Sequence, residues 1–112
     1  IKFLMLTIVE DNITYKLGRN AKENFELIDD AQDANPEYWW FHLEGHPSGH
    51  CIIYTENITN QMVTYAANLV KAHSKLKADK KVKVIYTQIK YVKKTKTIGQ
   101  VQLQGPTKYI SV

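Results

Sequence analysis

Gly18-Arg19-Asn20 stands directly before a stretch with helical character, and this combination is typical of a phosphate site. The start of a helix offers backbone N–H groups without partners and a partial positive charge. Arg19 is the only arginine in the sequence, and its planar guanidinium suits bidentate contact with a phosphate. The same residues also fit an ordinary strand-to-helix connection in which Arg19 pairs with a nearby acid, and the sequence leaves both interpretations open.

The segment Tyr38-Trp39-Trp40-Phe41-His42 is aromatic and has the character of a strand. Side chains of a strand alternate between its two faces. The alternation gives two sets: Trp39, Phe41 and Leu43, and Tyr38, Trp40 and His42. One set fills the core, and the other lies under a helix or is open to solvent. If it is open, its rings would stack on unpaired bases, at ~1–3 kcal/mol per base.

Three histidines, His42, His46 and His50, follow one another at a spacing of four residues. This spacing suggests a metal site on a helix, but Pro47 and the neighbouring glycines make a helix improbable there. A strand-turn-strand arrangement would still bring His42 and His50 opposite each other, so zinc stays open. No carboxylate or second cysteine completes a ligand pattern, and Ser48 near His50 lacks the third member of a hydrolytic triad. We therefore expect no metal, no cofactor and no catalytic activity.

Charge is sorted along the chain. Residues 1–60 contain 4 Lys and Arg residues against 10 Asp and Glu residues, whereas residues 61–112 contain 11 Lys residues against Asp79 alone. A concentrated positive surface attracts polyanions by focusing the field and releasing their condensed counterions. The sequence therefore favours a nucleic-acid-binding surface, and the alternative is a solvated lysine-rich face.

One lysine-rich part of this basic half is Lys90-Tyr91-Val92-Lys93-Lys94-Thr95-Lys96, which we expect to be a loop leaving a strand. Lysines neutralise phosphates without reading sequence, and a tyrosine adds a base or sugar contact. Together with Lys71, Lys75 and Lys77, this loop would neutralise ~4–6 phosphates, which predicts a slope of log K against log salt of about −3 to −4 for single strands.

The elements that position these residues follow from periodicity and turn chemistry. Helices are predicted over residues 21–31 and 60–77, with Asn20 as the N-cap of the first and Glu23 completing an approximate capping box. Strands are predicted over residues 3–9, 13–17, 38–43, 50–55, 82–86, 100–103 and 109–112. The order β-β-α-β-β-α-β-β-β indicates an α+β fold, a largely antiparallel sheet with two helices.

Length and composition limit the remaining possibilities. The 112 residues support a single domain over residues 1–112. Cys51 is the only cysteine, so no internal disulfide can form and a reducing, cytoplasmic location is favoured. The longest apolar run, residues 3–6, is far too short to cross a membrane, and we expect no membrane partner.

Motifs in a fixed order extend over nearly the whole chain. The first are Gly18-Arg19-Asn20-Ala21-Lys22-Glu23-Asn24 with Leu27, and Trp40-Phe41-His42 with Gly45 and Pro47-Ser48-Gly49-His50. The later ones are Ala66-Ala67, Ser74-Lys75, the strand at residues 84–86 with Thr87, and Tyr91-Val92-Lys93-Lys94 ahead of Gly99-Gln100-Val101. In this order they closely resemble the NFACT-R RNA-binding domain family.

The resemblance implies RNA binding, to tRNA or rRNA. Larger members of the family are ribosome-associated quality-control factors that recognise the large ribosomal subunit carrying peptidyl-tRNA, and small relatives consist of little more than this domain. Template-independent tailing of the stalled chain is associated with another module of the larger members, so it is not expected here. What the resemblance implies is a non-catalytic RNA-binding domain in translation or ribosome quality control.

We expect Arg19 and the helix start to seat a phosphate, the lysines to follow the RNA backbone, and Trp40, His42, Ser48 and His50 to contact bases or sugars. The predicted RNA-binding residues are Arg19, Asn20, Lys22, Trp40, His42, Ser48, His50, Lys71, Ser74, Lys75, Lys77, Lys90, Tyr91, Lys93, Lys94 and Lys96.

Three alternatives stay open. In the first, the chain is a protein-interaction module that docks on the ribosome or a partner protein through its acidic half. In the second, the chain is a small metal-dependent or hydrolytic enzyme centred on His42, His46 and His50. DNA binding is a variant of the RNA prediction, because phosphate contacts do not distinguish the sugar.

Overall fold

The computed structural model of the chain describes residues 5–112. Its elements in chain order are β1 (Leu6–Glu10), β2 (Ile13–Leu17), α1 (Ala21–Ala34), β3 (Trp39–Leu43), β4 (Cys51–Ile53), α2 (Asn60–Ala72), β5 (Lys83–Gln88), a 3₁₀ turn (Ile89–Tyr91), β6 (Val92–Lys94), β7 (Val101–Leu103) and β8 (Lys108–Ser111). The predicted order is confirmed, with one short strand, β6, added to it. Residues 3 and 4 of the predicted first strand lie outside the described residues.

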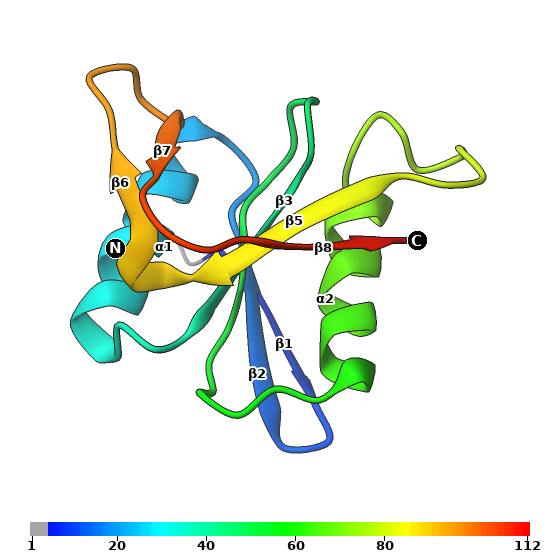
Figure 1. Ribbon diagram of the computed structural model, residues 1–112, viewed down its shortest axis with the longest axis horizontal. Helices are drawn as coiled ribbons and strands as arrows, with labels where there is room; N and C mark the ends of the chain where they lie inside the picture. Colours follow the sequence, from blue (N-terminus) through cyan, green and yellow to red (C-terminus); the bar gives the residue numbers. More distant parts are fainter. Residues whose placement is uncertain (1–4) are drawn as a thin grey trace.

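Six of the strands form one antiparallel sheet in the order β1-β2-β4-β3-β5-β8. β3 pairs with β4, with Trp40 opposite Ile52, and also with β5, with Phe41 opposite Tyr86. α1 and α2 lie on opposite sides of this sheet, and the separate β6–β7 hairpin lies on the side of α1 (Figure 1). The α+β prediction, with a largely antiparallel sheet and two helices, is therefore confirmed.

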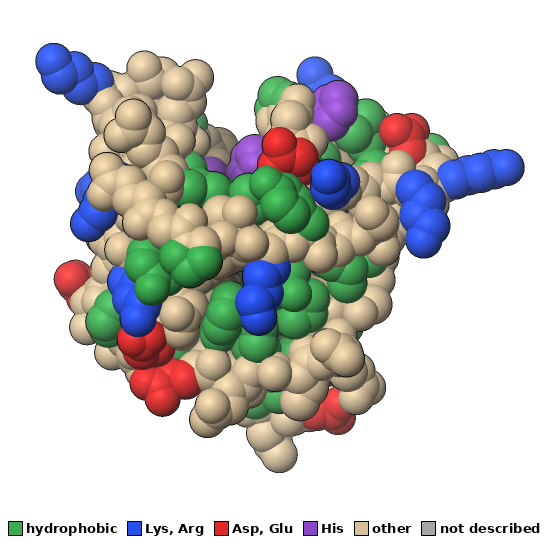
Figure 2. Space-filling model, viewed as in Figure 1, with side chains coloured by type: hydrophobic (Ala, Val, Ile, Leu, Met, Phe, Trp, Pro, Cys, Tyr) green, Lys and Arg blue, Asp and Glu red, His purple; other side chains and the backbone are tan. Residues whose placement is uncertain are grey.

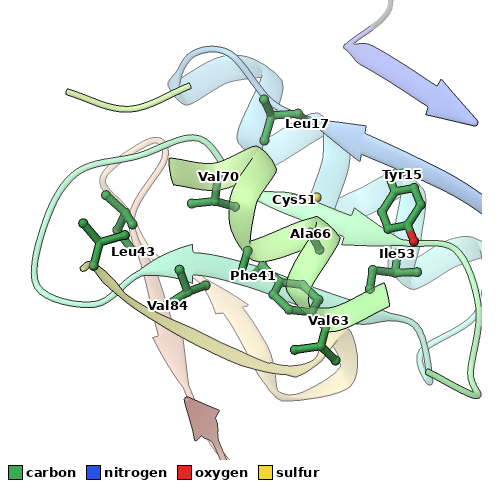
Figure 3. Close-up of a cluster of buried hydrophobic side chains, with 12 residues drawn as sticks. Tyr15, Leu17, Phe41, Leu43, Cys51, Ile53, Val63, Ala66, Val70 and Val84 are labelled. Carbon is green, nitrogen blue, oxygen red and sulfur yellow. The ribbon is translucent and has the colours of Figure 1, made fainter. Parts of the chain in front are cut away.

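Alternate side chains of β3 enter two different cores. Phe41 and Leu43 pack toward α2, where they join Val63 and Val70 in one buried cluster (Figure 3). Trp40 faces the other way and packs with the apolar face of α1. Because a helix covers each face of the sheet, alternation sends both sets of side chains inward.

α2 ends at Ala72, before its predicted end at residue 77. The hydroxyl of Ser74 donates to the carbonyl of Lys71 and accepts from the N–H of Leu76. These bonds turn the chain away from the helix axis, because they replace the next helical hydrogen bonds. Lys75 therefore lies in a turn beyond the helix rather than one helical turn after Lys71.

The lysine-rich segment at residues 90–96 is not the loop that the sequence predicted. Val92 is fully buried in the core beside α1. The side-chain amide of Gln32, on α1, donates to the carbonyls of Ile89 and Val92 at 3.1 and 2.8 Å. An apolar anchor and two hydrogen bonds thus hold the first part of this segment in regular structure against the helix.

One buried asparagine ties the start of α1 to the start of β4. Asn24 Oδ1 accepts a hydrogen bond from the N–H of His50 at 3.0 Å, and the N–H of Gly18 donates to the carbonyl of His50 at 2.9 Å. A Cβ on Gly18 would overlap Asn24 Oδ1, and a Cβ on Gly49 would overlap the Gly18 carbonyl oxygen. The two glycines are therefore required by the close approach of the backbone segments.

Replacement of Asn24 by alanine should lower the free energy of unfolding by about 1–3 kcal/mol, because it leaves the buried His50 N–H without an acceptor. The matched control is Asn68→Ala, since Asn68 lies exposed on α2 and bonds only to the carbonyl one turn earlier. Urea denaturation followed by circular dichroism measures both variants. Equal losses in the two would contradict the role assigned to Asn24.

Candidate nucleic-acid interface

Four segments that are distant in sequence converge on one cleft of about 530 Å³. They are the start of α1, the β3–β4 loop, the turn after α2 and the tip of the β6–β7 loop. The cleft is lined by residues 19–21, 24, 46–49, 73–76 and 98–100. Five residues predicted to bind RNA are brought together here, namely Arg19, Asn20, Ser48, Ser74 and Lys75.

Three further predicted lysines do not line this cleft, but each stands within two positions in sequence of a residue that does. We use the term rim lysines for the four exposed residues Lys22, Lys75, Lys77 and Lys96. Among the described residues, no carboxylate lies within ion-pair distance of any of them. Among the described residues, their charges are therefore not neutralised by ion pairs, and Lys75 is the one of the four that lines the cleft.

Arg19 and the start of α1 are partly engaged already. The guanidinium contacts the Glu23 carboxylate through Nε at 2.9 Å and Nη2 at 2.8 Å, and the Arg19 N–H donates to the same carboxylate at 3.0 Å. These hydrogen bonds lower the pKa of Glu23. Asn20 Oδ1 accepts from the N–H of Glu23, as an N-cap should. In the described part of the chain, the N–H groups of Asn20, Ala21 and Lys22 are left for an anion at this helix start.

Lys90 and Lys94 are not brought to the cleft. Lys90 Nζ lies 2.6 Å from Glu37 Oε1, and Lys94 Nζ lies 2.7 Å from Asp29 Oδ1. The Glu37 hydrogen bond raises the pKa of Lys90. The acidic first half of the chain thus supplies partners to lysines on this side of the domain, which the charge distribution along the sequence did not reveal.

Lys71, Tyr91 and Lys93 also lie outside the cleft. Lys71 Nζ donates to the carbonyl of Val112 at 3.2 Å. The ring of Tyr91 packs so closely on Gly105 that a Cβ there would overlap it. Lys93 is exposed on β6, among residues that do not line the cleft.

Trp40 is the clearest correction to the predicted base contacts. Its side chain is only 2% exposed, because α1 covers that face of β3, so it has no open ring face for stacking. Its ring is parallel to that of His42, with centroids 5.7 Å apart, and edge-on to that of His50 at 5.2 Å. Trp40 therefore packs against the rings of both histidines.

The two histidines line a second, smaller hollow beside the cleft. This histidine hollow, of about 340 Å³, is formed by His42, Pro47, Ser48, His50, Gly99, Gln100 and Val101. Figure 2 shows histidine side chains inside a notch between two lobes, which carry the β6–β7 loop on one side and the β3–β4 loop on the other. Lysine or arginine side chains project from both lobes in the same view.

Burial sets the charge of these rings. The pKa of His50 is lowered to about 3, chiefly by burial and then by neighbouring His42, against an opposing hydrogen bond with the Gly99 backbone. Burial also lowers the pKa of His42, although its bond to the Leu43 carbonyl opposes this. Both rings are therefore neutral at physiological pH.

The geometry does not form the metal or hydrolytic sites left open by the sequence. Within residues 5–112, no three His, Cys, Asp or Glu side chains are grouped to hold a metal ion. The Ser48 hydroxyl donates to the Gly49 carbonyl and accepts from the Leu43 N–H, so no nucleophile–base pair with His50 is present.

Several residues of the cleft escaped sequence reasoning, above all those of the β6–β7 loop. Gly99 has φ +85°, and a Cβ there would approach the Cβ of Ala21 to 2.8 Å. Ile98 is 55% exposed beside it, and Gln100 lines both the cleft and the hollow. Gly99 was the one available indicator, since a glycine between strands marks a turn or a close backbone approach.

A cleft bordered by unpaired cations on an α+β scaffold is typical of domains that bind phosphate-bearing polymers. The chain belongs to the NFACT protein RNA binding domain family, whose model matches residues 2–109. The resemblance deduced from the sequence motifs is therefore confirmed.

Two individual proteins extend this comparison. The Rqc2 homolog RqcH of Bacillus subtilis (strain 168) is 30% identical over 82 residues, which are 73% of this chain but only 14% of RqcH. The solved C-terminal part of the fibronectin/fibrinogen-binding protein from Streptococcus suis has the same fold, with a TM-score of 0.88 and 23% identity. That similarity covers 100% of this chain and 46% of the solved one.

Within residues 5–112, neither helix combines the length and the apolar character that crossing a membrane would require.

The buried neutral state of His50 predicts acid-sensitive stability. Its pKa is about 3 in the folded chain against 6.5 normally. The unfolded state therefore binds the extra proton, and stability falls as the pH drops from about 6.5 toward 3. Between pH 7 and pH 5 this linkage removes about 2 kcal/mol of unfolding free energy.

Denaturation at the two pH values should show a smaller loss in His50→Gln than in the native chain. His46→Gln is the control, because His46 is exposed in the β3–β4 loop. The same acid sensitivity in all three proteins would show that another group is responsible.

Proposed function

We propose that this domain binds RNA without catalysing a reaction, by seating the RNA backbone along the rim lysines of the cleft. Four unpaired lysines on three of the converging segments carry the proposal. Each offers a positive charge that no described carboxylate neutralises. The paired lysines, Lys16, Lys90 and Lys94, offer less, because an anion would first have to displace a carboxylate.

The polar groups inside the cleft suit the same ligand. The N–H groups of Ala21 and Lys22 are at the positive end of α1, where an anion is stabilised. Ile98, with its exposed side chain, offers apolar contact to a ribose or a base. This mixture of cations, amide donors and apolar surface is what a single-stranded or looped RNA requires.

The biological setting proposed is ribosome quality control, with tRNA or rRNA as the ligand. Membership of the NFACT RNA-binding family and the similarity to RqcH support this setting. Because the chain spans about a seventh of RqcH, the activity of the whole relative is not transferred here. The proposal concerns only the RNA contact made by this domain.

Lys75→Glu should weaken RNA binding at least tenfold, because it reverses the only lysine charge that lines the cleft itself. Lys80→Glu is the matched control, since Lys80 is exposed and does not line the cleft. Fluorescence anisotropy with labelled tRNA and a single-stranded RNA measures both. Equal weakening by the two variants would locate binding elsewhere.

The salt dependence of RNA affinity gives an independent estimate of the number of phosphate contacts. If the rim lysines neutralise about four phosphates, log K should fall with log salt at a slope of about −3 for single-stranded RNA. The slope should become shallower by about 0.7 in Lys75→Glu. Duplex DNA in parallel titrations tests the sugar preference. Affinity independent of salt would contradict the electrostatic mechanism, and nuclease-resistant binding to ribosomes would favour a protein partner.

A further inference from the structure

The histidine hollow opens beside the cleft and is continuous with it. Pro47, Ser48, Gly99 and Gln100 line both. A strand whose phosphates follow the rim lysines would therefore pass the mouth of the hollow. None of the residues that line it carries a formal charge at neutral pH, because His42 and His50 are both kept neutral by burial.

His42 presents an acceptor to this hollow. Its Nδ1 lies 2.6 Å from the carbonyl oxygen of Leu43. Since a carbonyl only accepts, the proton of the neutral ring is on Nδ1, and Nε2 is left as an unprotonated acceptor. No described group donates to it.

His50 adds an unsatisfied atom to the same place. Its side chain is 1% exposed, and its Nδ1 has no hydrogen-bonding partner among the described residues. The Nε1 of Trp40, whose ring centroid is 5.2 Å from that of His50, is unpartnered as well. Buried polar atoms are nearly always satisfied. His50 lines the hollow and Trp40 does not, so the unpartnered Nδ1 of His50 is the atom that points to a ligand there.

Gln100 supplies the complementary groups at the mouth. It is exposed, and its side-chain amide has no partner in the described part of the chain. The amide is both a donor and an acceptor. Ser48, by contrast, is already satisfied by the backbone.

We propose that the histidine hollow binds one unstacked nucleobase of the RNA strand held by the rim lysines, an inference that rests on the RNA binding proposed above. A base suits the site because it is flat, neutral and edged with donors and acceptors. Gln100 and His42 Nε2 would contact the polar edge of the base. A phosphate would find no cation inside the hollow.

The test compares a short oligouridylate and an oligoadenylate with an abasic ribose-phosphate strand of the same length. The native chain should bind at least one base-containing strand about tenfold more tightly than the abasic strand, as expected for one seated base. Gln100→Ala and His42→Phe should reduce this preference to about threefold or less. Gln102→Ala is the control, because Gln102 is exposed on β7 two residues further on and does not line the hollow.

A spectroscopic measurement separates contact from altered stability. The ¹⁵N resonance of His42 Nε2 should shift on addition of the preferred base-containing strand and stay in place with the abasic one. Equal affinity of the native chain for all three strands, or an unmoved resonance, would overturn the base site while leaving backbone binding intact. Failure to bind any strand would overturn the proposed function itself.

Discussion

The hydrogen bond from the His50 N–H to Asn24 Oδ1 ties α1 to the start of β4, and the site depends on this connection. Asn24 is buried, and Gly18 and Gly49 lack side chains so that the backbone segments can approach. This arrangement places the start of α1 against the β3–β4 loop and so creates one wall of the cleft. Residues that look like a phosphate motif in the sequence are therefore first of all architectural.

The same packing determines where the charged side chains lie. Acidic residues of α1 and the following loop pair with Lys16, Lys90 and Lys94, which lie beyond the cleft. Of the rim lysines, Lys22 lies in the first turn of α1 and the other three lie in loops and turns. No acidic residue of the described chain forms an ion pair with any of them. The domain thus has a flank on which Lys90 and Lys94 are paired with acids and a cleft that Lys75 lines without an ion-pair partner among the described residues.

Local patterns predicted most of the fold. Period-two alternation and turn residues located the strands, and Asn20 capped α1 as expected. The burial of Val92 and of Trp40 depends on long-range contacts that no local sequence pattern contains. Val92 was predicted in a loop but is buried under α1, and Trp40 was open to a functional interpretation until a helix was found over it. The lysine run at residues 90–96 likewise predicted binding from charge alone, because partners such as Glu37 are more than fifty positions away.

The proposed RNA contact at the cleft is tested most directly by backbone amide chemical shifts of the ¹⁵N-labelled domain during titration with RNA. The amide resonances that move most should belong to residues 19–22, 46–49, 73–77 and 96–100, which come from all four segments around the cleft. Those of residues 90–94, whose lysines are largely paired, should move little. The largest changes at residues 90–94, or on the exposed face of α2, would contradict this account.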